Sequence, residues 1–189
     1  MEKRIFERYS HTKDGKFIID IAAPKIEDLY NNYDKFAPYL KKDLEQGVVD
    51  YIVDSVNDLG NESFSIQFSI EAALDNDSIS RLKMSVSKYF LYLQDLEIRE
   101  LKKMFRTSLI LFLIGIVILT LSVWVNLHIE ETKTIINRVF AEGLTVAAWV
   151  SLWEALATFL VNWMPHRRQL KLYERIIHAP ILFKETPTI

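Results

Sequence analysis

The sequence predicts an α+β fold: a small strand-helix-strand-helix domain whose last helix continues into a transmembrane helical hairpin. Three observations lead to this prediction. Residues 64–72 alternate strictly between apolar and polar side chains, residues 108–127 form an uncharged run, and residues 143–163 form a second apolar run. The charges are also unevenly placed, because the first 106 residues hold 19 acidic and 16 basic side chains and the remaining 83 hold six and seven. Such a fall in charge density indicates a water-soluble part followed by a membrane part.

The composition allows one soluble domain with a small membrane part in 189 residues. A net charge of -2 gives no basic surface for nucleic acid, and the absence of cysteine excludes disulfides and thiol chemistry. We expect a cytoplasmic domain with a helical stalk over residues 1–106, a transmembrane hairpin over 107–165 and a basic cytoplasmic tail over 166–189.

The cytoplasmic domain is expected to begin with a short strand at residues 16–23. A helix follows over 43–60, because Val49, Ile52, Val53 and Val56 form an apolar stripe and Gly60 suits the end of a helix. The second strand is 64–72, where the period of two indicates a half-buried strand.

Two strands make a poor sheet, so a third is expected from residues 1–10 or from a second subunit. The segment 26–42 is expected to be a short helix or an ordered loop.

A long helix is expected from Asp77 or Ser78, either of which suits the N-cap position. Its apolar residues recur at spacings of three and four: Leu82, Val86, Tyr89, Leu93 and Leu96. This stripe packs either on the domain's own sheet or on a second copy, as a coiled stalk. The helix has no Gly or Pro before Gly115, so we expect it to run without a break into the first span.

The first span, residues 108–127, has 20 residues and no charge, which is the length of helix that a bilayer core of about 30 Å requires. The second span, 143–163, is closed by Pro165, and its helix is expected to begin well outside the membrane, near Glu130. Basic residues flank the hairpin on the side of both termini, which predicts cytoplasmic N- and C-termini. They are Arg99, Lys102, Lys103 and Arg106 before the first span and Arg167, Arg168, Lys171 and Arg175 after the second.

Glu154 lies in the middle of the second span, where a single carboxylate costs about 2.5–3.5 kcal/mol on insertion scales. Ser151, Thr158 and Asn162 share a small and polar face with it, so the carboxylate is expected to face protein or water. Three roles stay open: a contact between helices, the lining of an ion or proton path in an oligomer, or no role. Glu142 lies near the outer end of the same helix. It either forms an acidic pore mouth in an oligomer or is an ordinary interfacial residue.

The basic residues after the second span, Arg167, Arg168, Lys171 and Arg175, are candidates for binding anionic lipid headgroups as well as topology signals. No metal site is expected, because the four histidines are scattered without ligand spacing. No cofactor and no catalytic residue are expected either, since the chain lacks a phosphate-binding glycine loop and a nucleophile motif.

The stretches GLTVAAWVSLW, FLVNWMPHRR and LYER in residues 143–175, together with YNNYD and DYIVDSV, resemble a family of uncharacterised bacterial two-span inner-membrane proteins with a cytoplasmic N-terminal domain. The resemblance implies a multi-pass protein of the bacterial inner membrane and no activity.

The expected function is therefore non-enzymatic: a homo-oligomeric assembly or regulatory module whose soluble domain binds a protein partner or its own copies. The alternative is a homo-oligomeric ion channel with the second transmembrane helix lining the pore.

Overall fold

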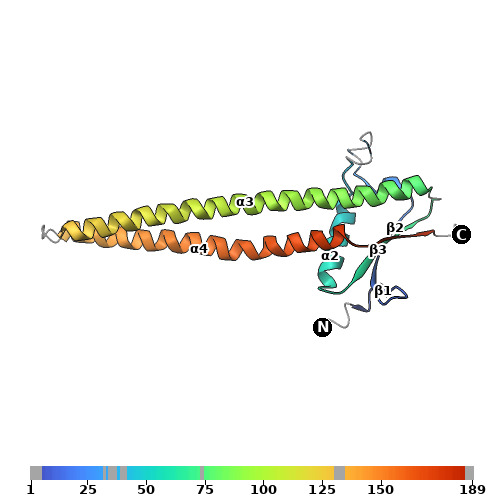
Figure 1. Ribbon diagram of the computed structural model, residues 1–189, viewed down its shortest axis with the longest axis horizontal. Helices are drawn as coiled ribbons and strands as arrows, with labels where there is room; N and C mark the ends of the chain where they lie inside the picture. Colours follow the sequence, from blue (N-terminus) through green and yellow to red (C-terminus); the bar gives the residue numbers. More distant parts are fainter. Residues whose placement is uncertain are drawn as a thin grey trace. The chain divides into compact units, whose positions relative to one another are not determined.

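The computed structural model describes residues 6–31, 33, 38, 42–72, 75–129 and 135–185. It is a mixed α+β fold with a four-stranded sheet and three α-helices, two of them long and apolar (Figure 1). The chain divides into two compact units. Unit 1 contains Met1–Asp95 and Leu170–Ile189, and unit 2 contains Leu96–Gln169.

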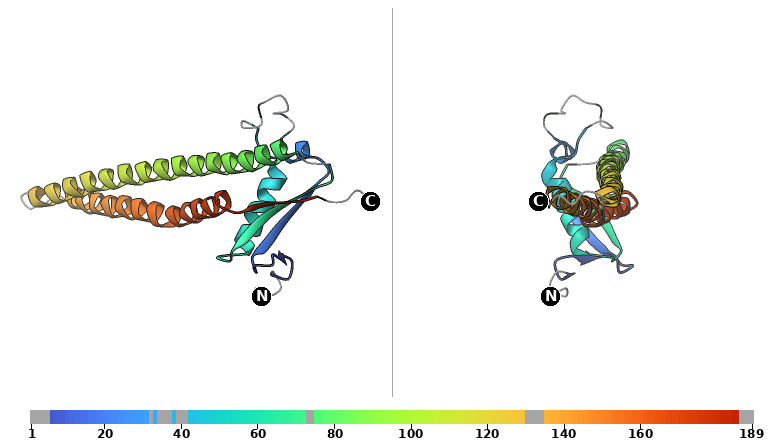
Figure 2. Two further views of the ribbon diagram at one scale, coloured as in Figure 1. Left: turned by 45° about the vertical axis from the view of Figure 1, so that its right-hand side comes forward. Right: turned by 90° about the vertical axis from the view of Figure 1, so that its left-hand side faces the viewer.

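The sheet of unit 1 has the strand order β1-β2-β3-β4 (Figure 2). The strands are β1 (Ser10–His11), β2 (Phe17–Ala23), β3 (Phe64–Ile70) and β4 (Ile181–Glu185). β1 is antiparallel to β2, whereas β2, β3 and β4 are mutually parallel. Parallel neighbours need crossover connections, and these determine how the rest of the chain is arranged.

One face of the sheet forms the core of unit 1, because every second residue of β2 and β3 is apolar and buried. Helix α2 (Gln46–Asp58) and the parts of the two long helices in this unit pack against that face. The packing residues of the helices are Val49, Ile52 and Val56 of α2, Leu82, Val86 and Phe90 of α3, and Leu172 and Ile176 of α4.

The opposite face of the sheet is polar at its centre. Asp20 Oδ1 accepts hydrogen bonds from Gln67 Nε2 at 3.2 Å and Ser69 Oγ at 2.8 Å. The alternation that predicts a strand at 64–72 therefore separates a buried apolar face from a polar face that links two neighbouring strands.

Local signals account for the ends of α2. Glu45 accepts a hydrogen bond from the Val48 backbone N–H at 3.0 Å and caps the helix. Gly60 follows the helix with a φ of 56°, the left-handed conformation that glycine adopts without strain. Of the segment 26–42, the structure shows a short 3-10 helix at Ile26–Leu29, and most of the residues beyond Asn31 lie outside the described part of the chain.

Helix α3 (Asn76–Ile129) is one element of 54 residues. It begins slightly earlier than predicted, since Asp75 rather than Asp77 or Ser78 accepts from the backbone N–H of Ser78 at 3.1 Å. Leu82 and Val86 are fully buried in the core of unit 1, and Tyr89 and Leu93 pack against it. The apolar stripe at the start of α3 therefore covers the domain's own sheet.

The C-terminus differs from the sequence prediction. Helix α4 (Ile135–Ile177) continues through Pro165, which the sequence predicts as its end, and β4 follows it. Proline lacks a backbone donor and disfavours a helix interior, yet α4 is one element on both sides of Pro165. In place of the expected tail, residues 166–185 contain the last turns of α4 and a strand of the sheet. Glu130, the expected start of α4, lies outside the described residues.

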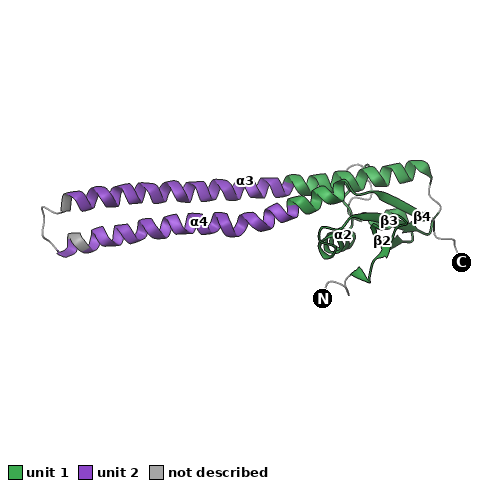
Figure 3. Cartoon of the chain, turned by 60° about the horizontal axis from the view of Figure 1, so that its bottom comes forward, with its two compact units in different colours: residues 1–95, 170–189 green, residues 96–169 purple. Residues whose placement is uncertain are grey.

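Unit 2 consists of α3 from Leu96 onward and of α4 as far as Gln169, drawn in purple in Figure 3. The two helices run antiparallel, because contacts pair early residues of one with late residues of the other. Ser122 Oγ lies 2.7 Å from Thr145 Oγ1, the Phe105 and Phe159 ring centroids are 6.2 Å apart, and the Glu97 carboxylate meets His166. Unit 2 is therefore inserted into the crossover between β3 and β4.

Candidate functional site

The outer surface of unit 2 is strongly apolar. Only 17% of the most apolar window of α3 and 11% of that of α4 is buried, although both helices are long enough to cross a membrane. A helix in the core of a soluble protein buries most of its surface, and exposed apolar patches of this extent mark binding or membrane surfaces. The most exposed large side chains include Val117, Leu127, Trp149, Val150, Trp153 and Val161.

The contact between the two helices of unit 2 is built from small residues at a spacing of seven. Ser108, Gly115 and Ser122 are buried on α3. A Cβ on Gly115 would lie 3.2 Å from the backbone nitrogen of Leu152, so the helices approach closely there. This row of small residues, which we call the seam, continues on the partner helix with Ala141, Ala148 and Ala155, each at most 3% exposed.

Glu154 does not take part in the seam. Its side chain is exposed, and among the residues that the structure describes it makes no hydrogen bond or ion pair. Ser151 and Thr158 are half-buried on the flank of the seam, and Ser151 Oγ donates to the Ala147 carbonyl at 2.8 Å. Asn162 and Glu142 are exposed. The residues of the predicted polar face are therefore on one helix, but no direct bond joins Glu154 to the other three.

The predicted face around Glu154 includes Ser151, Thr158 and Asn162, but the seam residues of α3 are not predicted. The signal that identifies them is the spacing of seven between small residues in both apolar runs. This spacing is a weak signal within one helix, and it indicates a helix contact only when the small residues of α3 and α4 face each other.

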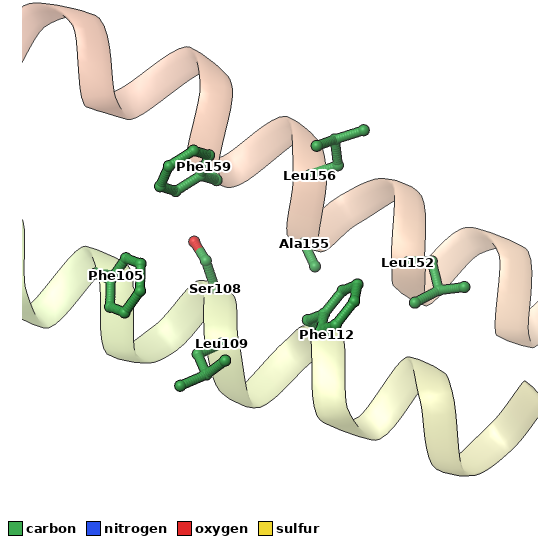
Figure 4. Close-up of a pocket in the computed structure, with 8 residues that line it drawn as sticks. All are labelled: Phe105, Ser108, Leu109, Phe112, Leu152, Ala155, Leu156 and Phe159. Atoms are coloured by element: carbon green, nitrogen blue, oxygen red, sulfur yellow. The ribbon is translucent and has the colours of Figure 1, made fainter.

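A groove of about 400 Å³ lies beside the seam (Figure 4). Its lining is almost entirely apolar, and Ser108 is directed from α3 toward α4 within it. The Ser108 hydroxyl is buried and, among the residues that the structure describes, has no hydrogen-bond partner. The lining residues are Phe105, Ser108, Leu109 and Phe112 of α3 and Leu152, Ala155, Leu156 and Phe159 of α4.

An aromatic column leads from the groove to a cation. The rings of Phe159 and Trp163 stack with centroids 5.6 Å apart, and the Arg167 guanidinium lies 5.4 Å from the Trp163 ring centroid. At the same end of unit 2, His166 Nδ1 lies 2.5 Å from Glu97 Oε1 and links the two helices. The predicted headgroup candidates Arg167, Arg168 and Lys171 are exposed.

Arg175, the fourth predicted headgroup candidate, makes its contacts within unit 1 instead. Its guanidinium donates to the carbonyl oxygens of Gly60 and of Glu62, the latter at 2.6 Å, and lies 5.1 Å from the Phe64 ring centroid. Partial burial lowers the pKa of Arg175 from its usual value, but a guanidinium remains charged in proteins. Arg175 therefore fixes the end of α4 to the turn between α2 and β3.

Replacing Arg175 with alanine is expected to lower the free energy of unfolding of unit 1 by roughly 2 kcal/mol, because two charge-assisted hydrogen bonds and a cation–π contact are lost. Thermal unfolding of the detergent-solubilised protein, followed through its circular dichroism, measures the change. Lys171→Ala is the matched control, since it removes a charge from an exposed position one turn earlier. Equal effects of the two substitutions would contradict this role of Arg175.

Comparison of the chain with protein-family models, with curated proteins and with solved structures gives no match. Among the residues that the structure describes, no group of three or more histidine, aspartate or glutamate side chains is placed to hold a metal ion. The exposed apolar surface of unit 2, its seam and groove, and the unbonded Glu154 are therefore the features from which a function can be argued.

Proposed function

We propose that this chain is an integral membrane protein that acts without catalysis, as a homo-oligomeric assembly or regulatory module with a cytoplasmic interaction domain. The observation that carries the proposal is the apolar surface of unit 2, which covers two helices and remains largely exposed. An apolar surface of this kind is stable in lipid, and a helix forms all its backbone hydrogen bonds internally there.

The sheet of unit 1 supports a topology with both ends of the hairpin on one side of the membrane. β3 precedes α3, β4 follows α4, and the two strands are hydrogen-bonded neighbours. Two paired strands cannot lie on opposite sides of a bilayer. The basic residues near both ends of unit 2 favour a cytoplasmic location for that side by the positive-inside rule, and the resemblance described above favours a bacterial inner membrane.

Self-association is favoured by Glu154. Within one chain this carboxylate is exposed in the middle of the second apolar run, and no described residue bonds it. A carboxyl group facing lipid is expensive, so ionisable residues in membranes generally face protein or water. A second copy of α4 would offer Glu154 the hydroxyls of Ser151 and Thr158, which flank the seam.

Glu154→Leu is expected to weaken self-association roughly ten-fold, the factor that corresponds to one or two interhelical polar contacts. Native mass spectrometry of the complex in mild detergent measures the distribution of oligomers. Glu142→Leu is the matched control, because it removes the same group from the outer end of the same helix. A wild-type monomer, or an unchanged distribution in the Glu154 variant, would overturn the oligomeric proposal.

The alternative, a homo-oligomeric ion channel, is favoured by the same unbonded carboxylate if α4 faces a central pore. Glu154→Gln separates the two functions, since it keeps the hydrogen-bonding capacity and removes the charge. A pore residue changes the ion flux or selectivity of proteoliposomes while the oligomeric mass stays constant. Unchanged flux together with a changed mass or melting temperature supports the assembly function.

A further inference from the structure

We propose that the groove of unit 2 binds one acyl chain of an anionic glycerophospholipid from the cytoplasmic leaflet, with its phosphate at Arg167. The proposal rests on the membrane location proposed above. It adds to that location a specific ligand, a binding site and the residues that recognise each part of the lipid.

The groove has the dimensions and depth of an acyl-chain site. It extends from Phe105 to Phe112 on α3, seven residues or roughly 10 Å along the helix axis. This is within the half-thickness of a bilayer core, about 15 Å. Arg106 is next to Phe105 and marks the end that faces the cytoplasm in the proposed topology. The groove therefore lies in the cytoplasmic half of the bilayer and opens toward the headgroup layer.

Ser108 supplies the polar feature that distinguishes this groove from an ordinary packing defect. Several hydroxyls of the two helices donate to a carbonyl four residues earlier, as Thr107 does to Lys103, Thr120 to Ile116 and Ser151 to Ala147. Ser108 is 6% exposed, makes no such bond and is directed into the groove. The ester carbonyls of a phospholipid lie beneath its phosphate and are free acceptors for such a hydroxyl.

The charges at the mouth of the groove are complementary to an anionic headgroup. Arg167 is held over Trp163, which stacks on Phe159 at the groove wall. A guanidinium at the end of this aromatic row favours an anionic lipid over a zwitterionic one.

A lipid fits the groove better than a second copy of the chain. An apolar side chain from another helix would fill the volume but leave the Ser108 hydroxyl without an acceptor. The backbone carbonyls within a helix are already bonded to its own N–H groups. A phospholipid brings both an apolar chain and free ester oxygens.

The test is native mass spectrometry of the full chain in mild detergent, titrated with palmitoyl-oleoyl phosphatidylglycerol or with phosphatidylcholine carrying the same chains. We expect one phosphatidylglycerol per protomer to be retained in preference to phosphatidylcholine. Ser108→Ala is expected to weaken its binding roughly five-fold, the factor for one ordinary hydrogen bond. Ser122→Ala is the matched control, because that serine is also buried on α3 but bonds Thr145 away from the groove.

Filling the groove tests the acyl chain separately. Leu109→Trp places a large ring at the groove wall and is expected to reduce phosphatidylglycerol binding more than Ser108→Ala does. Leu121→Trp is its control, since Leu109 and Leu121 are 46% and 47% exposed on the same helix. Arg167→Gln is expected to abolish the preference for the anionic lipid, whereas Arg168→Gln, with the same loss of charge, retains it.

Several results would overturn the lipid site while leaving the proposed function intact. One is equal binding of phosphatidylglycerol and phosphatidylcholine, and another is an equal loss of lipid binding in each variant and its control. A third is a Leu109→Trp effect on oligomeric mass alone, which would assign the groove to a contact between copies. Resistance of the wild-type protein to carbonate extraction tests the membrane location independently. If the protein is extracted, the proposed function itself fails.

Discussion

A chain that ends at residue 178 is expected to lose the folded structure of unit 1, although it keeps both long helices and all of residues 1–106. β4 provides the parallel partner of Ile66–Ile70, the Phe183 ring stacks on Phe68 at 5.9 Å, and Ile66 N–H donates to the Pro180 carbonyl at 2.9 Å. Loss of one aromatic and one aliphatic side chain from a core costs roughly 3–6 kcal/mol. A typical domain has only about 5–15 kcal/mol of stability.

Hydrogen exchange of the β3 amides, followed by mass spectrometry in detergent micelles, measures this loss. The control is a chain that ends after Glu185, which retains β4 and lacks only the four residues beyond it. We expect the control to protect β3 as the full chain does and the shorter chain to exchange at the rate of an unfolded segment. Native-like protection in the shorter chain would show that β4 is dispensable.

Gly115→Leu is expected to separate the two helices of unit 2. The first added atom, Cβ, would lie 2.8 Å from Leu152 Cδ2 and 3.2 Å from the Leu152 backbone nitrogen. The Leu152 side chain can turn away, but its backbone can move only with the whole of α4. Overpacking of this kind costs about 1–3 kcal/mol where side chains can adjust, and more where a helix must shift.

The chain has no cysteine, so a pair introduced at Ser122 and Thr145 reports on the seam alone. Their hydroxyl oxygens are 2.7 Å apart, and oxidation of the double cysteine variant is expected to give an intramolecular disulfide in high yield. When Gly115→Leu is added, we expect most of this disulfide yield to be lost. Gly143→Leu is the control, because a Cβ there meets nothing within 4 Å. Equal yields in the two leucine variants would contradict the close approach at Gly115.

Sequence patterns predict the parts of unit 1 whose partners are close along the chain. The alternation of 64–72 and the apolar stripe of 43–60 describe faces of single elements, and the structure contains β3 and α2 within those ranges. β4 escapes prediction because it is five residues long and its partner Ile66 lies more than 100 residues earlier. A short segment after a basic stretch gives no local indication that it completes a sheet.

The candidate site is predictable to a similar extent. The sequence alone identifies Glu154 as an unusual carboxylate and Arg167 as a basic residue beside the second apolar run. Neither the groove nor the isolated hydroxyl of Ser108 is visible in one helix, since both arise from how α3 and α4 face each other. Arg175 shows the converse: its charge suggests a lipid contact, but the nearby carbonyls of Gly60 and Glu62 take its hydrogen bonds.

The insertion of unit 2 between β3 and β4 determines the order in which this protein can fold during synthesis. A ribosome releases β3 long before β4, because the whole of unit 2 lies between them in the sequence. Until the last strand arrives, β3 has an open edge, the feature that leads nascent sheets to aggregate. The sheet can close only after both apolar helices have been synthesised. Completion of the sheet is therefore a late step in synthesis, and it requires that the end of α4 has returned to the start of α3.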